Sequence, residues 1–275
     1  MDRIFAMKAS DFKFDMQARD GCPLCGSTMK KEYTGMKAVD GGTAMFQQCA
    51  ECRLLYLDPA PTKESVEFFY RQIYSDPEFR KLDGHSHADP VKEFVAGLPV
   101  FERHLDFIEQ HKQPPGKMLD VGCSYGGILV EAASRGWRTE GIEPSMEAVK
   151  FCREKLGLNV TRGGIMDTQL QPGSVDVVVM LEVIEHLEDP VAALKKTNEL
   201  ARASSMLYLT SPNASSAAAM VLGSNWIGWK PPTHLQFFSY GTLPVLLEKT
   251  GWRPVKIKSG GGYPGQIMAV ARKSR

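Results

Sequence analysis

One segment constrains the fold of this chain more than any other: LDVGCSYGG, residues 119–127. It begins with apolar residues, as a buried strand does, and ends in a glycine-rich turn that leads into a helical pattern. Two kinds of protein use such a turn. The residues from Gly122 to Gly126 fit G-x-S-x-G, the turn that presents the nucleophilic serine of a hydrolase. A glycine-rich turn between a strand and a helix also lets a cofactor approach the backbone.

Strand and helix patterns alternate from this turn to the end of the chain. The run VDVVVML, residues 175–181, is almost entirely apolar, which is typical of a strand buried on both faces. The segments WRPVKIKSGG and IMAVARK can form a closing β pair. The alternation predicts an α/β fold with an open, mostly parallel sheet, in which ligands bind beyond the carboxyl ends of the strands.

The residues before the turn argue against a hydrolase. Such an enzyme needs earlier sheet strands and an oxyanion loop such as HGGG. The residues between the N-terminal cysteines and Met118 predict helices and loops instead, and they contain no HGG segment. Because Asp176, His186 and His234 follow later in the chain, a serine hydrolase that uses Ser124 stays open as an alternative.

A cofactor site makes a demand that the chain meets. An acidic residue should end the second strand, about 20 residues after the turn, and accept hydrogen bonds from ribose hydroxyls. Glu143, in the segment GIEPS, lies 21 residues after Gly122. The glycine spacing is G-x-x-x-G-G rather than the G-x-G-x-x-G of dinucleotide sites. We therefore predict a nucleoside cofactor that has no diphosphate.

Four of the six cysteines form a second pattern, CPLCG and CAEC. Zinc binds four thiolates tetrahedrally, and two CxxC turns on neighbouring hairpins supply them. We predict a structural zinc ribbon in residues 1–60, with a hairpin that turns at the Gly-Gly pair; redox-active CxxC pairs are the alternative. The ribbon holds eight Lys and Arg against eight Asp and Glu, which does not favour nucleic-acid binding. The predicted ligands are Cys22, Cys25, Cys49 and Cys52.

Residues 61–115 predict a helical linker or cap. Thr62 can cap a helix entered through Pro61, and residues 83–90, DGHSHADP, predict a polar loop whose two histidines are solvated. A long amphipathic helical region then continues to Pro114-Pro115-Gly116.

Overall charge points to no polyanionic partner, because 33 Lys and Arg balance 32 Asp and Glu. The first residues carry charges without an apolar run, and the longest uncharged stretch, residues 203–229, contains Pro212. We therefore expect a soluble, cytoplasmic protein without a membrane span.

Together these motifs resemble the class I S-adenosylmethionine-dependent methyltransferases over roughly residues 60–275. LDVGCSYGG resembles their first motif, and GIEPS resembles the acidic end of their second strand. GGIMDTQLQPGSVDVVVMLEVIEHLEDP resembles their adenine loop, fourth strand and next helix, and the cysteine pairs are similar to those of bacterial members with an N-terminal zinc ribbon. The implied fold is a Rossmann-like, mostly parallel sheet with an antiparallel closing strand, in a cofactor domain at residues 116–275.

The resemblance implies S-adenosylmethionine as cofactor and assigns a place to each contact residue. The turn lies beneath the methionine portion, an acid binds the ribose, a short segment covers the adenine, and the end of the fourth strand lines the transfer site. Two tyrosines of the preceding helix can close over the cofactor. In that order the residues are Asp120, Gly122, Ser124 and Gly126; Glu143, with Pro144 beside the adenine; Ile165, Met166 and Asp167; Leu181 and Glu182; and Tyr70 and Tyr74.

Methyl transfer to a hydroxyl requires a group that removes its proton, and histidine is the natural base near neutral pH. Two histidines qualify: His186 in EVIEHLEDP and His234 in a segment rich in Trp and Phe. The first belongs to an E-x-x-E-H cluster with Glu182 and Glu185, which resembles quinone and RNA-end O-methyltransferases whose cluster can hold a divalent metal. We expect His186 to organise the site through hydrogen bonds. His234 is either the base or a structural histidine.

We therefore expect a methyltransferase that acts on a small molecule, with an oxygen of a sugar, phenol or similar biosynthetic intermediate as the methyl acceptor. A ribosomal RNA methyltransferase that uses its zinc ribbon is the alternative, although phosphate contacts require Lys and Arg that the ribbon lacks in excess. A binding protein that kept only the cofactor fold is a further alternative. The acceptor and the oligomeric state do not follow from the residues.

Overall fold

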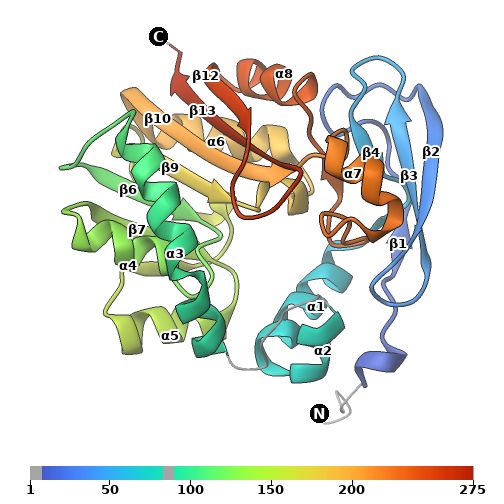
Figure 1. The fold of residues 1–275 in the computed structure, drawn as a ribbon, viewed down its shortest axis with the longest axis horizontal. Coiled ribbons are helices and arrows are strands. Elements are labelled where there is room, and N and C mark those ends of the chain that lie inside the picture. The colour runs from blue at the N-terminus through green and yellow to red at the C-terminus, as the bar shows by residue number, and fades with distance from the viewer. Residues whose placement is uncertain (1–7, 83–89, 275) are drawn as a thin grey trace.

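The computed structural model describes residues 8–82 and 90–274, arranged around a central sheet (Figure 1). Its seven strands follow the order β12-β13-β10-β9-β6-β7-β8. The neighbouring pairs from β10 to β8 are parallel, and β13 runs antiparallel to both β10 and β12. The expected parallel sheet with an antiparallel closing strand is confirmed. The strands are β6 (Lys117–Val121), β7 (Arg138–Glu143), β8 (Val160–Arg162), β9 (Val175–Leu181), β10 (Ala201–Pro212), β12 (Trp252–Ser259) and β13 (Gln266–Lys273).

Helices cover both faces of this sheet because its central strands are apolar on both sides. Val177 and Val179 of β9 belong to the cluster that includes α3 and α4, whereas Val178 and Met180 belong to the cluster that includes α6 and α8. The period of two along a strand accounts for this division. The helices of the sheet region are α3 (Pro90–Glu109), α4 (Gly127–Ser134), α5 (Met146–Leu156), α6 (Pro190–Leu200) and α8 (Thr242–Lys249). A further helix, α7 (Ala217–Leu222), packs in a cluster with the N-terminal strands.

Residues 63–82 form two further helices, α1 (Lys63–Ser75) and α2 (Pro77–Leu82). The predicted cap is confirmed, since the Thr62 hydroxyl accepts a hydrogen bond from the backbone N–H of Ser65 at 3.3 Å. These helices bury their own aromatic cluster, with Phe69 of α1 and Phe79 of α2 packed on Phe12. This cluster is separate from the two that flank the sheet.

A second sheet, of four strands, contains the cysteines. Its order is β11-β4-β3-β2, with the predicted hairpin between β2 (Lys30–Lys37) and β3 (Thr43–Cys49) turning at the Gly-Gly pair. The fourth strand, β11 (Gln236–Phe237), pairs with β4 (Leu55–Leu57) although it lies far along the chain. Figure 1 shows these N-terminal strands beside α7, away from α4 and α5. A small two-stranded sheet joins β1 (Met16–Gln17) to β5 (Ala60–Pro61).

The expected polar loop at 83–90 falls almost entirely outside the described residues, and its two histidines lie there. The predicted domain boundaries at residues 60 and 115 remain predictions. The ribbon sheet also includes β11, which lies beyond both boundaries in the sequence. Among the helices that the structure describes, none has the length and apolar character needed to cross a membrane.

Candidate active site

The glycine-rich turn joins β6 to α4 in a conformation that its glycines permit. Gly122 and Gly126 have φ angles of 74° and 77°, in the left-handed region that favours glycine. Space is also short, because a Cβ on Gly122 would lie 2.7 Å from Cγ2 of Val183 and one on Gly126 would lie 2.5 Å from Cδ1 of Leu158. Ser124, between them, has a positive φ of 46°. The turn therefore needs both glycines, and the first brings it against the segment that follows β9.

Glu143 ends β7 and holds the turn through its carboxylate. One oxygen accepts a hydrogen bond from the backbone N–H of Ser124 at 2.9 Å, and the other accepts one from Ser145 at 2.8 Å. The side chain is 3% exposed, and this burial raises the pKa of Glu143, although the two N–H bonds act in the opposite direction. Since a carboxylate offers about four lone-pair positions, two remain available for other donors, and a ribose contact stays a prediction.

Asp120 lies in β6, next to this carboxylate, and is also buried. Burial raises the pKa of Asp120 well above its ordinary value, and repulsion from Glu143 raises it further. Two acids thus converge at the carboxyl edge of β6 and β7. A cofactor that carries positive charge relieves their repulsion, because an opposite charge nearby favours the ionised form of a carboxyl group.

The residues expected beside an adenine occupy two different environments. Ile165 is buried in the core on the α6 side, whereas Met166 is 59% exposed, and Pro144 and Asp167 are exposed as well. One oxygen of Asp167 accepts a hydrogen bond from the backbone N–H of Gly164 at 2.9 Å. Adenine contact by these residues stays a prediction, for which Met166 has the accessible side chain and Ile165 has a packing role.

Leu181 and Glu182, at the end of β9, lie where the transfer site is expected. The two carboxylate oxygens of Glu182 are both engaged: one accepts a hydrogen bond from the Tyr263 hydroxyl, and the other accepts one from the side-chain amide of Gln266, each at 2.6 Å. Glu182 also has a positive φ of 54°. The turn between β12 and β13, together with the first residue of β13, thus holds this carboxylate in place, and Leu181 packs against the cluster on the α3 side.

Glu185 and two histidines form a compact polar group next to Glu182. The donor atoms of Glu185, His186 and His234 all lie within 4.8 Å of one another. Glu185 is fully buried, and within the described residues neither of its oxygens has a hydrogen-bond partner, although Ser211 lies nearby. Burial, and then the charge of Glu182, raise the pKa of Glu185 well above its usual range. A buried carboxylate without a partner is costly, so this site is suited to a cation.

His234 reaches this group through backbone pairing rather than through sequence proximity. The N–H of the next residue, Leu235, donates to the carbonyl of Glu185 at 2.8 Å, and β11 then pairs with β4. The Nδ1 of His234 lies 2.9 Å from the carbonyl of Gly228. A carbonyl can only accept, so we assign the hydrogen to Nδ1 and the lone pair to Nε2. Burial, followed by the nearby His186 and Lys230, lowers the pKa of His234 well below its ordinary value.

This low pKa bears on the expectation that His234 is the base. A base must accept a proton at working pH, and the surroundings of His234 disfavour the charged imidazolium. A neutral imidazole with an available Nε2 is instead the form in which histidine binds a metal. The structure brings both predicted histidines together, with ring centroids 4.6 Å apart.

Tyr70 and Tyr74 of α1 lie at the two ends of this site. The Tyr74 hydroxyl donates to Oγ of Ser124 in the glycine turn at 3.2 Å. The Tyr70 hydroxyl oxygen lies 2.7 Å from Nδ1 of His186, which is also 2.8 Å from the carbonyl of Thr233. The helix lies against the glycine turn, and the expected closure of its two tyrosines over the cofactor stays a prediction.

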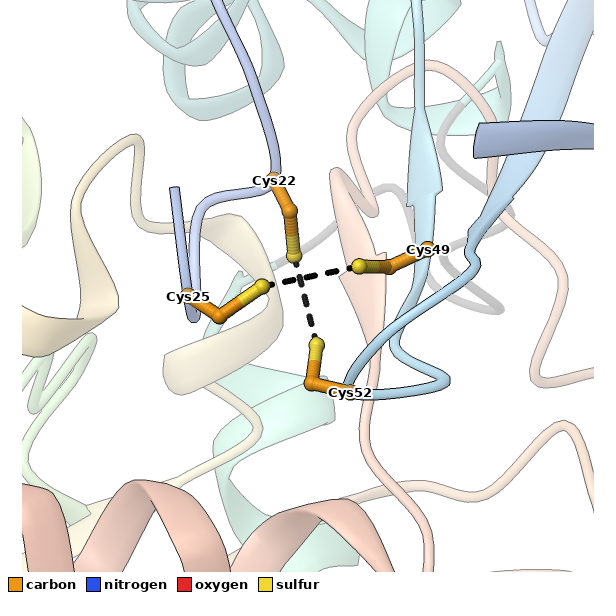
Figure 2. Close-up of side chains that lie close together, drawn as sticks. All are labelled: Cys22, Cys25, Cys49 and Cys52. Carbon is orange, nitrogen blue, oxygen red and sulfur yellow. Dashed lines mark hydrogen bonds between the residues drawn. The ribbon is translucent and has the colours of Figure 1, made fainter. Parts of the chain in front are cut away.

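The four N-terminal cysteines form a separate cluster. Figure 2 shows their sulfur atoms turned toward one point, with Cys22 opposite Cys52 and Cys25 opposite Cys49, each pair separated by 3.5 Å. All four sulfurs lie within 4.8 Å of one another, and the cysteines are free thiols. Tetrahedral zinc with Zn–S bonds of about 2.3 Å separates its sulfurs by about 3.8 Å, which this cluster nearly matches.

Sequence reasoning missed Tyr263 and Gln266, the two partners of Glu182. Their segment, GGGYPGQ, has the composition of a turn, and three consecutive glycines predict an unusual backbone there. That backbone carries two side chains back to the carboxyl edge of β9. An aromatic residue within a glycine-rich turn was the feature of the sequence that could have indicated these two residues.

The fold and this site define an S-adenosylmethionine-dependent methyltransferase. The sheet order, the glycine turn without a diphosphate motif, and the buried Glu143 with unused lone pairs fit that cofactor together. The chain belongs to the family described as a methyltransferase domain, which matches residues 94–257. This family membership argues against a hydrolase that uses Ser124 as its nucleophile.

Named relatives and solved structures agree with this family. The chain is 33% identical over 163 residues to a ubiquinone biosynthesis O-methyltransferase of Methylococcus capsulatus, covering 54% of this chain and 68% of the relative. It is 28% identical over 207 residues to the Burkholderia pseudomallei protein of the same name, covering 69% and 89%. These relatives favour a small-molecule O-methyltransferase over an RNA methyltransferase.

Two solved structures share the fold at low identity. A methyltransferase of Archaeoglobus fulgidus that depends on S-adenosylmethionine is similar at a TM-score of 0.54 and 21% identity, over 66% of this chain and 97% of that chain. The 1,6-didemethyltoxoflavin-N1-methyltransferase of Burkholderia thailandensis has a TM-score of 0.54 at 12% identity, over 82% and 98%. At these identities the likeness concerns the fold alone.

Proposed function

We propose that this enzyme transfers the methyl group of S-adenosylmethionine to a hydroxyl oxygen of a small phenol-like molecule. The observation that carries the proposal is the juxtaposition of a cofactor turn with a buried acid–histidine group. Gly122 contacts the segment that follows β9, since a Cβ there would meet Val183, and Glu185, His186 and His234 lie directly beyond it. The names of the relatives, ubiquinone biosynthesis O-methyltransferases, support a phenolic acceptor.

The residues divide the work between holding the cofactor and preparing the acceptor. S-adenosylmethionine supplies a methyl group on a sulfonium, so the protein must align the acceptor oxygen with it and accommodate the acceptor's proton. Glu143 and the glycine turn hold the nucleoside and methionine portions, and Asp120 stabilises the positive end. Glu182, fixed by Tyr263 and Gln266, shapes the acceptor side of the transfer site.

A divalent cation is the second component that we propose for the acceptor side. The residues present fit it, because Glu185 is a fully buried carboxylate without a hydrogen-bond partner among the described residues, and the Nδ1 atoms of both histidines face backbone carbonyls. Glu185, His186 and His234 would hold the ion. Bound there, it would polarise an acceptor oxygen and ease loss of its proton. This view assigns His234 to metal binding, in keeping with its lowered pKa.

We further propose that Cys22, Cys25, Cys49 and Cys52 hold one structural zinc ion. Support comes from the separation of the four sulfurs and from the small size of the ribbon sheet, since modules of this size commonly need a metal to fold. Nothing in the ribbon's charge favours a nucleic-acid partner.

Methyl transfer tests the proposed function directly. The purified enzyme is incubated with S-adenosylmethionine and a panel of simple phenols, catechols and sugars, and mass spectrometry detects the methyl ether and S-adenosylhomocysteine. We expect turnover with phenolic hydroxyls. Turnover that is confined to RNA or to sugars would refute the phenol assignment, and failure to bind S-adenosylhomocysteine in calorimetry would refute the whole proposal.

The cation is tested with Glu185→Gln and a matched control. Titration of Mn²⁺ into the wild-type protein, followed by its paramagnetic signal, should reveal one site in addition to zinc. Glu185→Gln should lose this site, whereas Glu154→Ala, an exposed acid on α5, should keep it. Equal Mn²⁺ binding by the wild type and Glu185→Gln would contradict the assignment.

A further inference from the structure

The helix α1 contacts both halves of the active site with two tyrosines that lie one helical turn apart. Tyr70 and Tyr74 are four residues apart and therefore share a face of the helix. One hydroxyl lies against His186 at 2.7 Å and the other against Ser124 at 3.2 Å. The tyrosines thus connect the acceptor side to the cofactor turn through a single rigid element.

The Tyr74 contact is built into the cofactor turn. Its ring packs on that of Tyr125, with centroids 5.6 Å apart, and its hydroxyl donates to Ser124. The same Ser124 gives its backbone N–H to Glu143, the proposed ribose ligand. A cofactor bound between Glu143 and the turn would therefore contact the Tyr74 hydroxyl directly.

The Tyr70 contact fixes the orientation of the His186 imidazole ring. Nδ1 of His186 faces two oxygens, the Thr233 carbonyl at 2.8 Å and the Tyr70 hydroxyl at 2.7 Å. Because the carbonyl only accepts, the hydrogen resides on Nδ1, and the tyrosine oxygen shares it. Two acceptors on one side of the imidazole set its rotation, so that Nε2 keeps one direction.

The support beneath α1 allows it to act as a unit. Its neighbouring face, with Phe69 and Ile73, belongs to the aromatic cluster formed with the N-terminal segment and α2, against which the two tyrosine rings also pack; this cluster is distinct from those that flank the main sheet. Within the described residues, α1 meets the active site through the two tyrosine hydroxyls, the ring contact of Tyr74 with Tyr125, and packing on α5. The polar contacts among these form and break more readily than a buried apolar interface.

From this arrangement we infer that Tyr70 is a positioning residue for His186 and that Tyr74 makes this positioning depend on the cofactor. Cofactor binding adds contacts to Tyr74, holds α1 in place and so fixes His186 before the acceptor binds. The inference rests on the proposed function, and it adds an order of events: cofactor first, acceptor second.

The experiment follows the exposure of His186 without using enzyme activity. Diethyl pyrocarbonate modifies accessible histidines, and peptide mass spectrometry gives the rate at each one. His111, half-buried and bonded through Nδ1 to the carbonyl of Phe107, serves as the internal reference. The variants are Tyr70→Phe and Tyr74→Phe, with Tyr33→Phe on the exposed face of β2 as the matched control. S-adenosylhomocysteine, at a concentration shown by calorimetry to saturate each variant, is the probe.

In the ligand-free protein, Tyr70→Phe should react at His186 about 2- to 10-fold faster than wild type, the ratio that one neutral hydrogen bond provides. S-adenosylhomocysteine should slow the reaction of His186 in wild type and in Tyr33→Phe, and not in Tyr74→Phe. An unchanged rate in Tyr70→Phe would overturn the positioning role. Protection that persists in Tyr74→Phe would mean direct shielding by the ligand and overturn the coupling.

The design separates this inference from the proposed function. If wild type fails to bind S-adenosylhomocysteine, the proposed function is wrong and the coupling through Tyr74 falls with it. The ligand-free comparison of Tyr70→Phe with wild type still decides whether Tyr70 positions His186.

Discussion

Replacing Glu143 with alanine is the sharpest perturbation of the cofactor site. The carboxylate is 3% exposed, and each oxygen already accepts one backbone N–H, from Ser124 and from Ser145. We propose that its two remaining lone-pair positions accept hydrogen bonds from the ribose hydroxyls. A hydrogen bond to a charged group contributes about 1.5–3 kcal/mol, so the loss of two such bonds corresponds to about 3–6 kcal/mol. The dissociation constant for S-adenosylhomocysteine should rise at least about 100-fold.

The stability of the ligand-free variant should change less than its affinity. Two buried N–H donors lose their acceptor, at about 1–3 kcal/mol each. Against this, the substitution removes a carboxylate whose raised pKa records the cost of burial and which repels Asp120. We expect the free energy of unfolding to fall by no more than about 2 kcal/mol, so that the variant remains folded and its weak binding can be measured.

Isothermal calorimetry with S-adenosylhomocysteine gives the affinity, and thermal unfolding followed by circular dichroism gives the stability. Glu143→Gln keeps one acceptor oxygen, so its affinity should fall between those of wild type and Glu143→Ala. The exposed Glu154→Ala should bind like wild type. A Glu143→Ala protein that is folded and binds within about threefold of wild type, well under 1 kcal/mol, would refute the ribose assignment.

Three further outcomes follow from the structure. His104 is buried against the Tyr208 hydroxyl at 2.6 Å, and burial lowers its pKa from 6.5 to about 4. The unfolded chain therefore binds a proton below pH 6.5 that the folded protein refuses, so stability should fall by about 3 kcal/mol between pH 6.5 and 4; urea unfolding should show a smaller fall in His104→Gln. Cys52→Ser should lower the zinc content from about one ion per chain, by elemental analysis, and lower the melting temperature. Ser124→Ala should retain S-adenosylhomocysteine binding within about tenfold, or 1.4 kcal/mol, and a fluorophosphonate should label neither protein.

The sheet, and the positions of the residues proposed to bind the cofactor, were predictable because their signals are local. Each strand, each helix cap and the glycine turn is indicated by residues within one short stretch of sequence. The position of Glu143 follows from counting along one β–α–β unit. The period of two that divides Val177 from Val178 is likewise a property of one strand.

The acceptor half was predictable only as a set of candidates, because its assembly depends on distant pairings. β11 has only two residues, too short for any periodic pattern, yet it determines where His234 lies. Tyr263 belongs to a turn that reads as a simple connection, and its bond to Glu182 spans more than 80 positions of the chain. The partner of Tyr70 could not be predicted either. Helical spacing places a side chain on one face of a helix but does not identify the residues that this face contacts.

The same pairings connect the cysteine ribbon to the proposed acceptor site. Leu235 is bonded on both sides: its N–H donates to the carbonyl of Glu185, and its own carbonyl accepts the N–H of Leu57 in β4. The side-chain amide of Gln236 adds bonds to the carbonyls of Ile184 and Leu187, at 3.0 and 2.7 Å. His234 directly precedes Leu235, so a shift of the ribbon relative to the main sheet would move one of the proposed cation ligands. Support of the proposed acceptor side is a sufficient reason for a ribbon without net charge, so no nucleic-acid partner has to be assumed. The cofactor half, built on β6 and β7, contains none of these bonds, and loss of zinc should therefore impair methyl transfer more than it impairs binding of S-adenosylhomocysteine.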